Sequence, residues 1–362
     1  MIQSTNFPLS TYSLQPYGSW EAMSEKVRAL GLDGLEVIAD LDNLADDIPH
    51  SLVTGYHMLF YPDWVDFFRQ NKPALIRKFG NLEFAQSFYR CKTPEDLVQV
   101  FRNDLALGIR LGAPYMVYHI SDSSLEESYT YQWEHTDYEV MDAALEVINE
   151  ILRGVEPTFD FLVENEWWPG FTFTDSKKTE YLLSRIEYPR VGIMLDTGHL
   201  MNTNWKLETQ WEGIQYILKM IEEHGELSKH IYGLHFHQSM SGKYCRETVG
   251  KVPEDFPLEY LQEYNRNYSH ILQIDRHRPW TEEECVRIIS RIQPKYLTHE
   301  ISGAVYRGKT SAIMNQMRVI RRGFMLDLDK LTYEQAVERR MRRKEKRGMT
   351  GNAFLDRVIN AW

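Results

Sequence analysis

A regular alternation between short apolar runs and longer segments of helical periodicity is the feature that most constrains how this chain folds. Eight runs have the length of a strand, contain many β-branched and aromatic residues, and end at polar residues, glycine or proline. They cover residues 2–7, 34–40, 52–58, 115–121, 161–166, 192–198, 231–237 and 296–302. The segments between them contain helical patterns, most clearly at 94–112, 138–155 and 210–225. The alternation predicts an α/β protein.

Strands that are separated by helices pair in parallel, because parallel neighbours need a long crossover connection. Eight such units predict a (β/α)8 barrel, the TIM-barrel architecture, which typically uses about 250 residues. The chain has 362 residues, so we expect loop insertions, at 59–93, 121–139 and 239–273. We expect the barrel domain to occupy residues 1–323 and a basic, helical C-terminal extension to occupy 324–362. The competing doubly wound sheet usually has a glycine-rich loop after its first strand, and this sequence has none there.

Charge and cysteine content limit the binding partners and the cellular compartment that we expect for this protein. The formal net charge is −11, which disfavours a nucleic-acid partner, because such proteins usually carry a clustered basic surface. No apolar stretch approaches the roughly 20 residues that cross a bilayer, and the three cysteines do not form a disulfide framework. We therefore expect a cytoplasmic protein, not bound to a membrane, that acts on a small molecule. The basic cluster at 338–348 is either a solvated helix face or a contact with an acidic partner or a second subunit, so the sequence is compatible with a homo-oligomer.

Residues of the types that bind metals stand at the ends of the predicted strands. In a barrel the active site forms at the C-terminal ends of the strands. Those ends and the loops after them carry His57, His119, Glu164, Asp196, His199, His235, His237, Asp275, His277, His299 and Glu300. Each residue alone has an ordinary explanation as a hydrogen-bonded core residue or a cap. Buried carboxylates are costly unless they are paired or bind a metal, however, and the repetition on successive strands favours a shared metal site.

The segment DRH, residues 275–277, can also be interpreted either structurally or as part of a metal site. Asp275 and His277 are two positions apart, so their side chains share a face if the segment is extended. They form either a salt bridge in a loop or a pair of metal ligands. The long insertion between His235 and Asp275 has to fold back if the pair is to reach the other candidates.

The order of these motifs resembles the xylose isomerase-like TIM barrels, a superfamily that includes endonuclease IV and many sugar isomerases and epimerases. The likeness covers residues 1–323, and LDTGH at 195–199 is similar to the Asp-Thr-x-His signature of both branches. The resemblance to the sugar epimerases implies one divalent ion, held by Glu164, Asp196, His235 and Glu300. The resemblance to endonuclease IV implies three zinc ions, and its motif positions are filled here by His57, His119, Glu164, Asp196, His199, His235, Asp275, His277 and Glu300.

The endonuclease-like ligand set implies two or three divalent ions per chain, of Zn, Mn or Fe. His237 stands where an amide side chain is common in that branch, so His235 and His237 could exchange roles. We expect hydrolysis of a phosphoester or a related bond in a small, sugar-like substrate. The expected catalytic residues are Glu164, Glu300 and His199, and the expected substrate-binding residues are His237, Trp167, Trp168 and Glu36.

Two other functions fit the same residues. A one-ion enzyme would isomerise or epimerise a sugar or sugar phosphate, or act as a related lyase, with Glu164 and Glu300 as its acid–base pair. A metal-binding barrel without turnover would serve as a partner protein. The number of ions per chain separates the first of these functions from hydrolysis.

Overall fold

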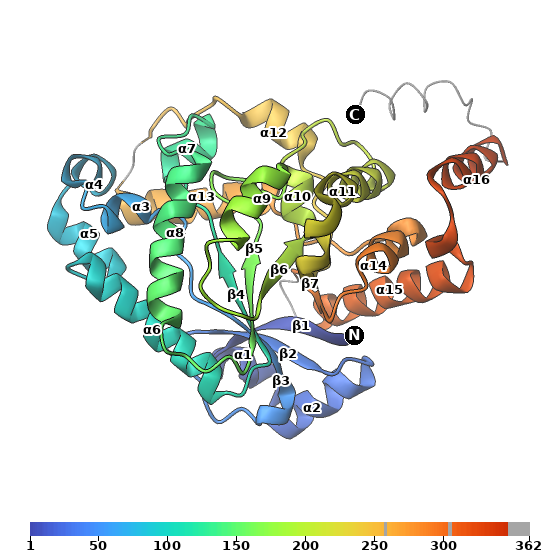
Figure 1. Cartoon of the computed structure of the whole chain (residues 1–362), viewed down its shortest axis with the longest axis horizontal. Helices are drawn as coiled ribbons and strands as arrows, with labels where there is room; N and C mark the ends of the chain where they lie inside the picture. Colours follow the sequence, from blue (N-terminus) through green and yellow to red (C-terminus); the bar gives the residue numbers. More distant parts are fainter. Residues whose placement is uncertain (257–258, 303–305, 347–362) are drawn as a thin grey trace.

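A closed barrel of eight parallel strands forms the centre of the molecule (Figure 1). The computed structural model describes residues 1–256, 259–302 and 306–346. The strands pair in chain order: β1(Ile2–Leu9), β2(Gly34–Ala39), β3(Val53–His57), β4(Tyr115–His119), β5(Asp160–Glu164), β6(Val191–Asp196), β7(Ile231–His235) and β8(Tyr296–His299). β1 closes the ring by pairing with β8, so that Ile2 lies opposite Tyr296. The predicted (β/α)8 barrel is confirmed, and no strand end differs from its predicted position by more than three residues.

Helices surround the barrel and fill its loops. They are α1(Thr11–Leu14), α2(Trp20–Ala29), α3(Val65–Phe68), α4(Lys72–Phe79), α5(Leu82–Tyr89), α6(Pro94–Arg110), α7(Leu125–Thr130), α8(Asp137–Leu152), α9(Ser176–Leu183), α10(Thr197–Asn202), α11(Gln210–His224), α12(Gly242–Thr248), α13(Tyr260–Ile274), α14(Val286–Ile292), α15(Tyr306–Met325) and α16(Tyr333–Lys346). The three clearest predicted helices are α6, α8 and α11, and each begins with a capping box that satisfies backbone N–H groups of its first turn. Among the described residues, no helix is both long and apolar enough to cross a lipid bilayer.

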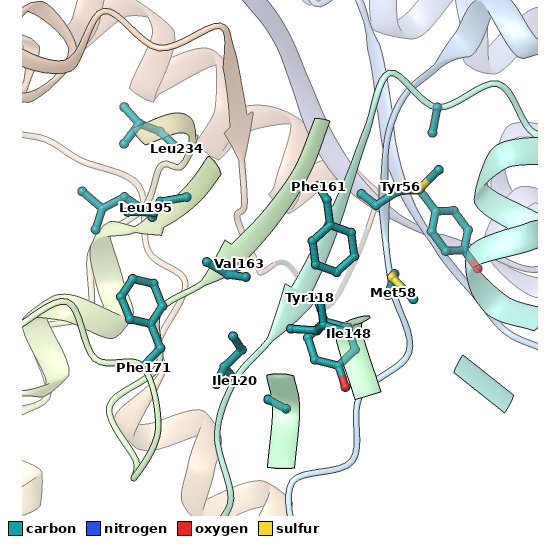
Figure 2. Close-up of a cluster of buried hydrophobic side chains, with 14 of the residues drawn as sticks. Tyr56, Met58, Tyr118, Ile120, Ile148, Phe161, Val163, Phe171, Leu195 and Leu234 are labelled. Atoms are coloured by element: carbon teal, nitrogen blue, oxygen red, sulfur yellow. The ribbon is translucent and has the colours of Figure 1, made fainter. Parts of the chain in front are cut away.

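Alternation along the strands divides their side chains between the surrounding helices and the barrel interior. Tyr118, Phe161 and Val163 belong to the large core between strands and helices, where Ile148 of α8 also packs (Figure 2). The positions between them contribute to a separate apolar cluster inside the barrel, whose buried members are Tyr115, Val117, Leu162, Met194 and Tyr296. Because side chains alternate along a strand, the residues two positions further along also face the interior. Those residues include the predicted metal ligands His119, Glu164 and Asp196.

The predicted insertions form short helices around the C-terminal end of the barrel. The segment 59–93 contains α3, α4 and α5, the segment 121–139 contains α7, and the segment 239–273 contains α12 and nearly all of α13. α13 lies across the ends of the strands (Figure 1) and docks on α7. Asn267 Nδ2 donates to Ser128 Oγ, and the His270 Nε2 atom lies 3.2 Å from the carbonyl oxygen of Ser128. This contact covers part of the barrel mouth.

The described part of the C-terminal extension packs against the barrel. Ala336 of α16 is fully buried with Trp211 of α11. Three arginines of α16 form ion pairs with the run of glutamates before α14, in the pairs Arg340–Glu282, Arg343–Glu283 and Arg339–Glu284. Three arginines of the basic cluster at 338–348 thus form ion pairs with the glutamates at 282–284 of the same chain. Residues 347–362 of the expected extension lie outside the described residues.

Candidate metal centre

The ends of neighbouring strands bring the predicted ligands together. Strand pairing places His119 opposite Glu164 and Asp196 opposite His235. The described residues that could hold a metal form three groups, and the ligand atoms of each group lie within 4.8 Å of one another. Group 1 is His57, His119 and Glu164; group 2 is Glu164, Asp196, His235 and Glu300; group 3 is His199, His237, Asp275 and His277. All nine residues predicted as ligands therefore converge at the barrel mouth.

In group 1, two imidazole nitrogens and one carboxylate oxygen face a common position. His57 Nε2 and His119 Nε2 are 2.9 Å apart, and they lie 3.3 and 3.0 Å from Glu164 Oε2. Burial disfavours the charged form of His119, but Glu164 and Glu166 outweigh burial and raise the pKa of His119 to about 10. Convergent donor atoms of these types suit a divalent cation, which displaces protons when it binds.

Group 2 collects three carboxylates around one imidazole. His235 Nδ1 lies 2.8 Å from Glu164 Oε1, 2.9 Å from Glu300 Oε2 and 3.8 Å from Asp196 Oδ2. Burial lowers the pKa of His235, but the surrounding glutamates outweigh burial and hold this pKa well above its usual value. Three carboxylates so close together need positive charge between them, because their mutual repulsion is strong where water is excluded.

Group 3 explains the segment DRH. Asp275 Oδ2 lies 3.0 Å from His277 Nδ1 and 3.5 Å from His199 Nε2. The preceding insertion folds back because Gln238 and Arg278 form an antiparallel bridge, in which each backbone N–H donates to the other residue's carbonyl oxygen, at 2.8 and 3.0 Å. Asp275 and His277 therefore contact each other and also reach the predicted ligand His199, an arrangement that fits both a salt bridge and the predicted pair of ligands.

His237, which we expected to bind substrate, lies beside a predicted metal ligand. Its Nε2 atom is 2.8 Å from Asp196 Oδ2, and its ring stacks on the His277 ring with the centroids 4.4 Å apart. A Cβ atom on Gly198 would lie 2.1 Å from His237 Cε1, so the motif LDTGH requires glycine at this position. The structure places His235 in group 2 and His237 in group 3.

Several atoms of the candidate ligands are buried without a hydrogen-bond partner. They are Glu164 Oε2, Asp275 Oδ1, Glu300 Oε2 and His237 Nδ1. A buried polar atom that lacks a partner costs about 1–3 kcal/mol, and coordination to a cation would satisfy it. Imidazole nitrogens and carboxylate oxygens are donor types that suit Zn, Mn and Fe. The residues present therefore fit divalent metal ions.

Comparison with known proteins shows which family shares this barrel. A family model described as "Xylose isomerase-like TIM barrel" matches residues 24–302. The chain belongs to the xylose isomerase-like TIM barrel family. The resemblance drawn from the strand-end motifs is thereby confirmed at the level of the family. No curated protein sequence matches the chain.

Solved structures similar to this xylose isomerase-like barrel include enzymes of different kinds. Endonuclease IV from Thermus thermophilus is 14% identical, with a TM-score of 0.49 over 89% of this chain and 100% of that chain. D-psicose 3-epimerase, solved in the presence of D-fructose, is 12% identical, with a TM-score of 0.48 over 89% of this chain and 99% of that chain. The probable 3-DHS dehydratase AsbF from Bacillus anthracis is 12% identical, with a TM-score of 0.41 over the same shares.

In this xylose isomerase-like barrel, Glu36 of β2 lies behind His235, on the side away from group 2. His235 Nε2 hydrogen bonds to Glu36 Oε2 at 3.1 Å and lies 2.9 Å from Glu36 Oε1, and Glu36 Oε2 also accepts hydrogen bonds from Tyr115 Oη at 2.6 Å and Thr298 Oγ1 at 2.9 Å. A carboxylate that accepts a hydrogen bond from a ligating imidazole fixes the tautomer and orientation of the ring. These contacts fit a positioning role for Glu36 beside the predicted ligand His235, and its predicted contact with substrate stays a prediction.

Replacing Glu36 with glutamine is expected to weaken metal binding by about 10- to 100-fold, because the neutral amide no longer supports the basicity of His235. Competition between the protein and a chromophoric chelator for Zn²⁺ measures this affinity. The exposed Glu25 on α2 offers a matched control, and Glu25→Gln should leave the affinity unchanged. Equal affinities for the two variants would contradict the positioning role.

Glu166 is a site residue that the sequence reasoning missed. Its Oε1 atom lies 2.9 Å from His119 Nδ1, and its Oε2 atom lies 3.6 Å from His199 Nδ1. It is buried and bridges predicted ligands of groups 1 and 3. The signal was present in the sequence ENE at 164–166, because alternate residues at a strand end point the same way.

His299 and the tryptophan pair lie outside the three groups. His299 belongs to β8 but faces the helices, where its Nδ1 atom is 2.9 Å from Gln316 Nε2 of α15. Burial lowers the pKa of His299 to about 4, so it is a neutral core residue. Trp167 and Trp168 follow β5, with ring centroids 4.6 Å apart, and the Trp167 ring is 5.0 Å from the His199 ring. The tryptophans therefore border the candidate metal centre.

Proposed function

We propose that the protein is a divalent-metal-dependent hydrolase that cleaves a phosphoester or related bond in a small, sugar-like substrate, with two or three ions per chain. The observation that carries this proposal is the position of group 3 beside groups 1 and 2. A one-ion enzyme would need only the four residues of group 2. The four further potential ligands of group 3, His199, His237, Asp275 and His277, converge at the same mouth, where the bridge between Gln238 and Arg278 holds the segment of Asp275 and His277.

Carboxylates link the groups to one another. Glu164 belongs to groups 1 and 2. Glu300 lies 2.9 Å from His235 through Oε2 and 3.4 Å from His277 through Oε1, so it spans groups 2 and 3. Bound divalent ions supply positive charge to the oxygens of a phosphoester and make hydroxide available at neutral pH. Glu164 and Glu300 would hold such ions at fixed separation, and His199, beside Asp275, would contact the substrate's reacting group.

The covered mouth and the acidic charge support a small substrate. Tyr268 and Leu272 of α13 line the same cavities as the ligands His119 and Asp275. A duplex would have to displace this helix, and the net charge of −11 would repel its phosphates. We therefore propose a small-molecule substrate and no nucleic-acid partner. A homo-oligomer stays compatible with this proposal.

The second candidate function is isomerisation or epimerisation of a sugar or sugar phosphate with a single ion. One observation favours it: group 2 has four ligands of its own, and two of these, Glu164 and Glu300, could serve as an acid–base pair. In that case His57, His119, Asp275 and His277 would contact the substrate. A barrel that binds metal without turnover would leave the cavities at this mouth without a role.

Replacing His277 with alanine separates the two enzymes. For the hydrolase, we expect protein purified without chelators to carry two or three ions per chain, and His277→Ala to lose one ion together with chelator-sensitive phosphodiester or phosphomonoester hydrolysis. For the isomerase, the metal content would stay at one ion, and His277→Ala would mainly raise the KM. Elemental analysis and paired substrate panels, with solvent-deuterium exchange for ketoses, measure these outcomes. The exposed His50 provides the control His50→Ala.

A further inference from the structure

Two cavities meet at the ligand groups and extend in different directions. The first has a volume of about 230 Å³ and runs from His119 and His277 towards Trp168 and α13; we call it the aromatic arm. The second has a volume of about 300 Å³ and runs from the same two histidines towards Asn6 and Ser302; we call it the polar arm. A substrate bound at the candidate ligands therefore has room for one substituent in each arm.

The walls of the aromatic arm are apolar. Trp167 and Trp168 form one wall, and each is 8% exposed. Tyr268, Ile271 and Leu272 of α13 contribute to another wall. Tyr268 is 59% exposed and Leu272 is 42% exposed. An apolar group in the arm would remove these surfaces from water, which stabilises a complex.

Three polar side chains in the same arm, Ser124, Ser128 and Asp63, are bonded to the protein. Ser124 Oγ accepts from Glu127 N at the start of α7, and Ser128 Oγ donates to the Leu125 carbonyl oxygen while it accepts from Asn267. Asp63 Oδ1 accepts from Lys78 Nζ at 2.9 Å. These bonds reduce the number of donors and acceptors left for the hydroxyls of a sugar ring. The aromatic arm therefore favours a ring without hydroxyl groups.

The polar arm differs in its chemistry. It shares seven lining residues with the aromatic arm, Tyr268 and Leu272 of α13 among them, and the residues that line the polar arm alone are Asn6, Glu36, Ile38, His57, Glu300 and Ser302. Lys309 Nζ donates to Asn6 Oδ1 and to the Asn6 carbonyl oxygen at 2.7 Å, so an ammonium group stands behind this lining. Charged and amide groups of this kind suit a small hydroxylated substituent.

We propose that the substrate is an asymmetric phosphodiester, with an aryl or cycloalkyl ring in the aromatic arm and a small hydroxylated substituent in the polar arm. This inference rests on the proposed function. Hydrolysis would add one water molecule across a P–O bond: the phosphorus gains the hydroxyl oxygen, and the departing oxygen gains a proton and leaves as an alcohol or phenol. A cavity of about 150 Å³ accepts benzene, so the aromatic arm has room for one ring with a short substituent.

Binding of phosphonates, which are not hydrolysed, tests this inference. Calorimetry of the metal-loaded protein should show that phenylphosphonate and cyclohexylphosphonate bind at least about 10-fold more tightly than methylphosphonate, a difference of about 1.4 kcal/mol. Trp168→Ala should reduce the phenyl-to-methyl ratio to below about 3-fold, or about 0.65 kcal/mol. Leu272→Ala, at an exposed position that lines both arms, should reduce the ratio in the same direction. Leu261→Ala, at an exposed position of α13 outside the arm, should leave it unchanged.

The outcomes separate the two proposals. Equal affinities for methylphosphonate and phenylphosphonate in the metal-loaded protein would overturn the aromatic arm as a ring site and leave the hydrolase proposal standing. A phenyl preference that survives both Trp168→Ala and Leu272→Ala would overturn it as well. Failure of every phosphonate to bind the metal-loaded protein would count against the hydrolase proposal itself, and this inference would fall with it.

Discussion

Replacing Glu164 with glutamine is expected to remove turnover and to lower the metal content of the protein. Glu164 belongs to two ligand groups, and its two oxygens lie within 3.3 Å of ring nitrogens of His57, His119 and His235. An amide offers one weaker oxygen donor in place of two charged ones, so it cannot serve both groups. We expect kcat/KM to fall by at least about 1,000-fold, which corresponds to about 4 kcal/mol of transition-state stabilisation.

Elemental analysis and steady-state kinetics on the same preparation measure both effects of Glu164→Gln. Glu222 is exposed on α11, so Glu222→Gln is the matched control and should retain full metal content and activity. If Glu164→Gln kept its ions and its kcat/KM, the shared-carboxylate description of groups 1 and 2 would be wrong.

Replacing Lys78 with methionine is expected to destabilise the fold by about 3–5 kcal/mol, because it leaves buried carboxylates without their cation. Lys78 Nζ lies 2.9 Å from Asp63 Oδ1 and 2.7 Å from Asp66 Oδ2, and its side chain is 6% exposed. Burial lowers the pKa of Lys78, but the three aspartates around it outweigh burial and raise this pKa, so the ammonium stays charged. Denaturant unfolding measures the loss. Lys72→Met, at an exposed position of the same helix α4, should change stability little.

The Lys78→Met effect should also depend on pH. Burial and the neighbouring Asp63 raise the pKa of Asp122 from 3.8 to about 7, while Lys78 opposes the increase. A carboxyl whose pKa is raised in the folded state stabilises the fold below its unfolded pKa, and this contribution is lost as the pH rises through the folded pKa. Without Lys78 the shift grows, so the variant should lose more stability than the wild type between about pH 5 and pH 8. If the free energy of unfolding fell by the same amount between about pH 5 and pH 8 in Lys78→Met and in the wild type, this account would be contradicted.

The barrel and most of the candidate ligands were predictable because both follow from local periodicity. Each strand is a short apolar run, and its last inward-facing position is two residues beyond an inward apolar one, as for Val117 and His119. Parallel pairing in chain order then brings these ends to one rim. Glu164, Asp196 and His235 could therefore be expected to meet before any coordinates were known.

The features that could not be predicted depend on contacts between residues that are distant in the sequence. The meeting of Asp275 with His199 needs the bridge between Gln238 and Arg278, which no local pattern announces. Glu36 orients His235 from a strand that lies 199 residues earlier. Arg339 and Arg343 of α16 pair with glutamates that lie 55 and 60 residues earlier in the chain. Such partners are fixed by the assembled fold rather than by spacing.

The pairing of β1 with β8 has a consequence for biosynthesis. Ser4 and Thr298 hydrogen bond across 294 positions, so the first strand leaves the ribosome long before its partner and must wait with an open edge. Unpaired edges of this kind invite association with other chains. Glu300 directly follows β8, the last strand to be synthesised. Group 2 is therefore complete only after β8 pairs with β1. A cation bound earlier by the nascent chain would be held by an incomplete set of ligands.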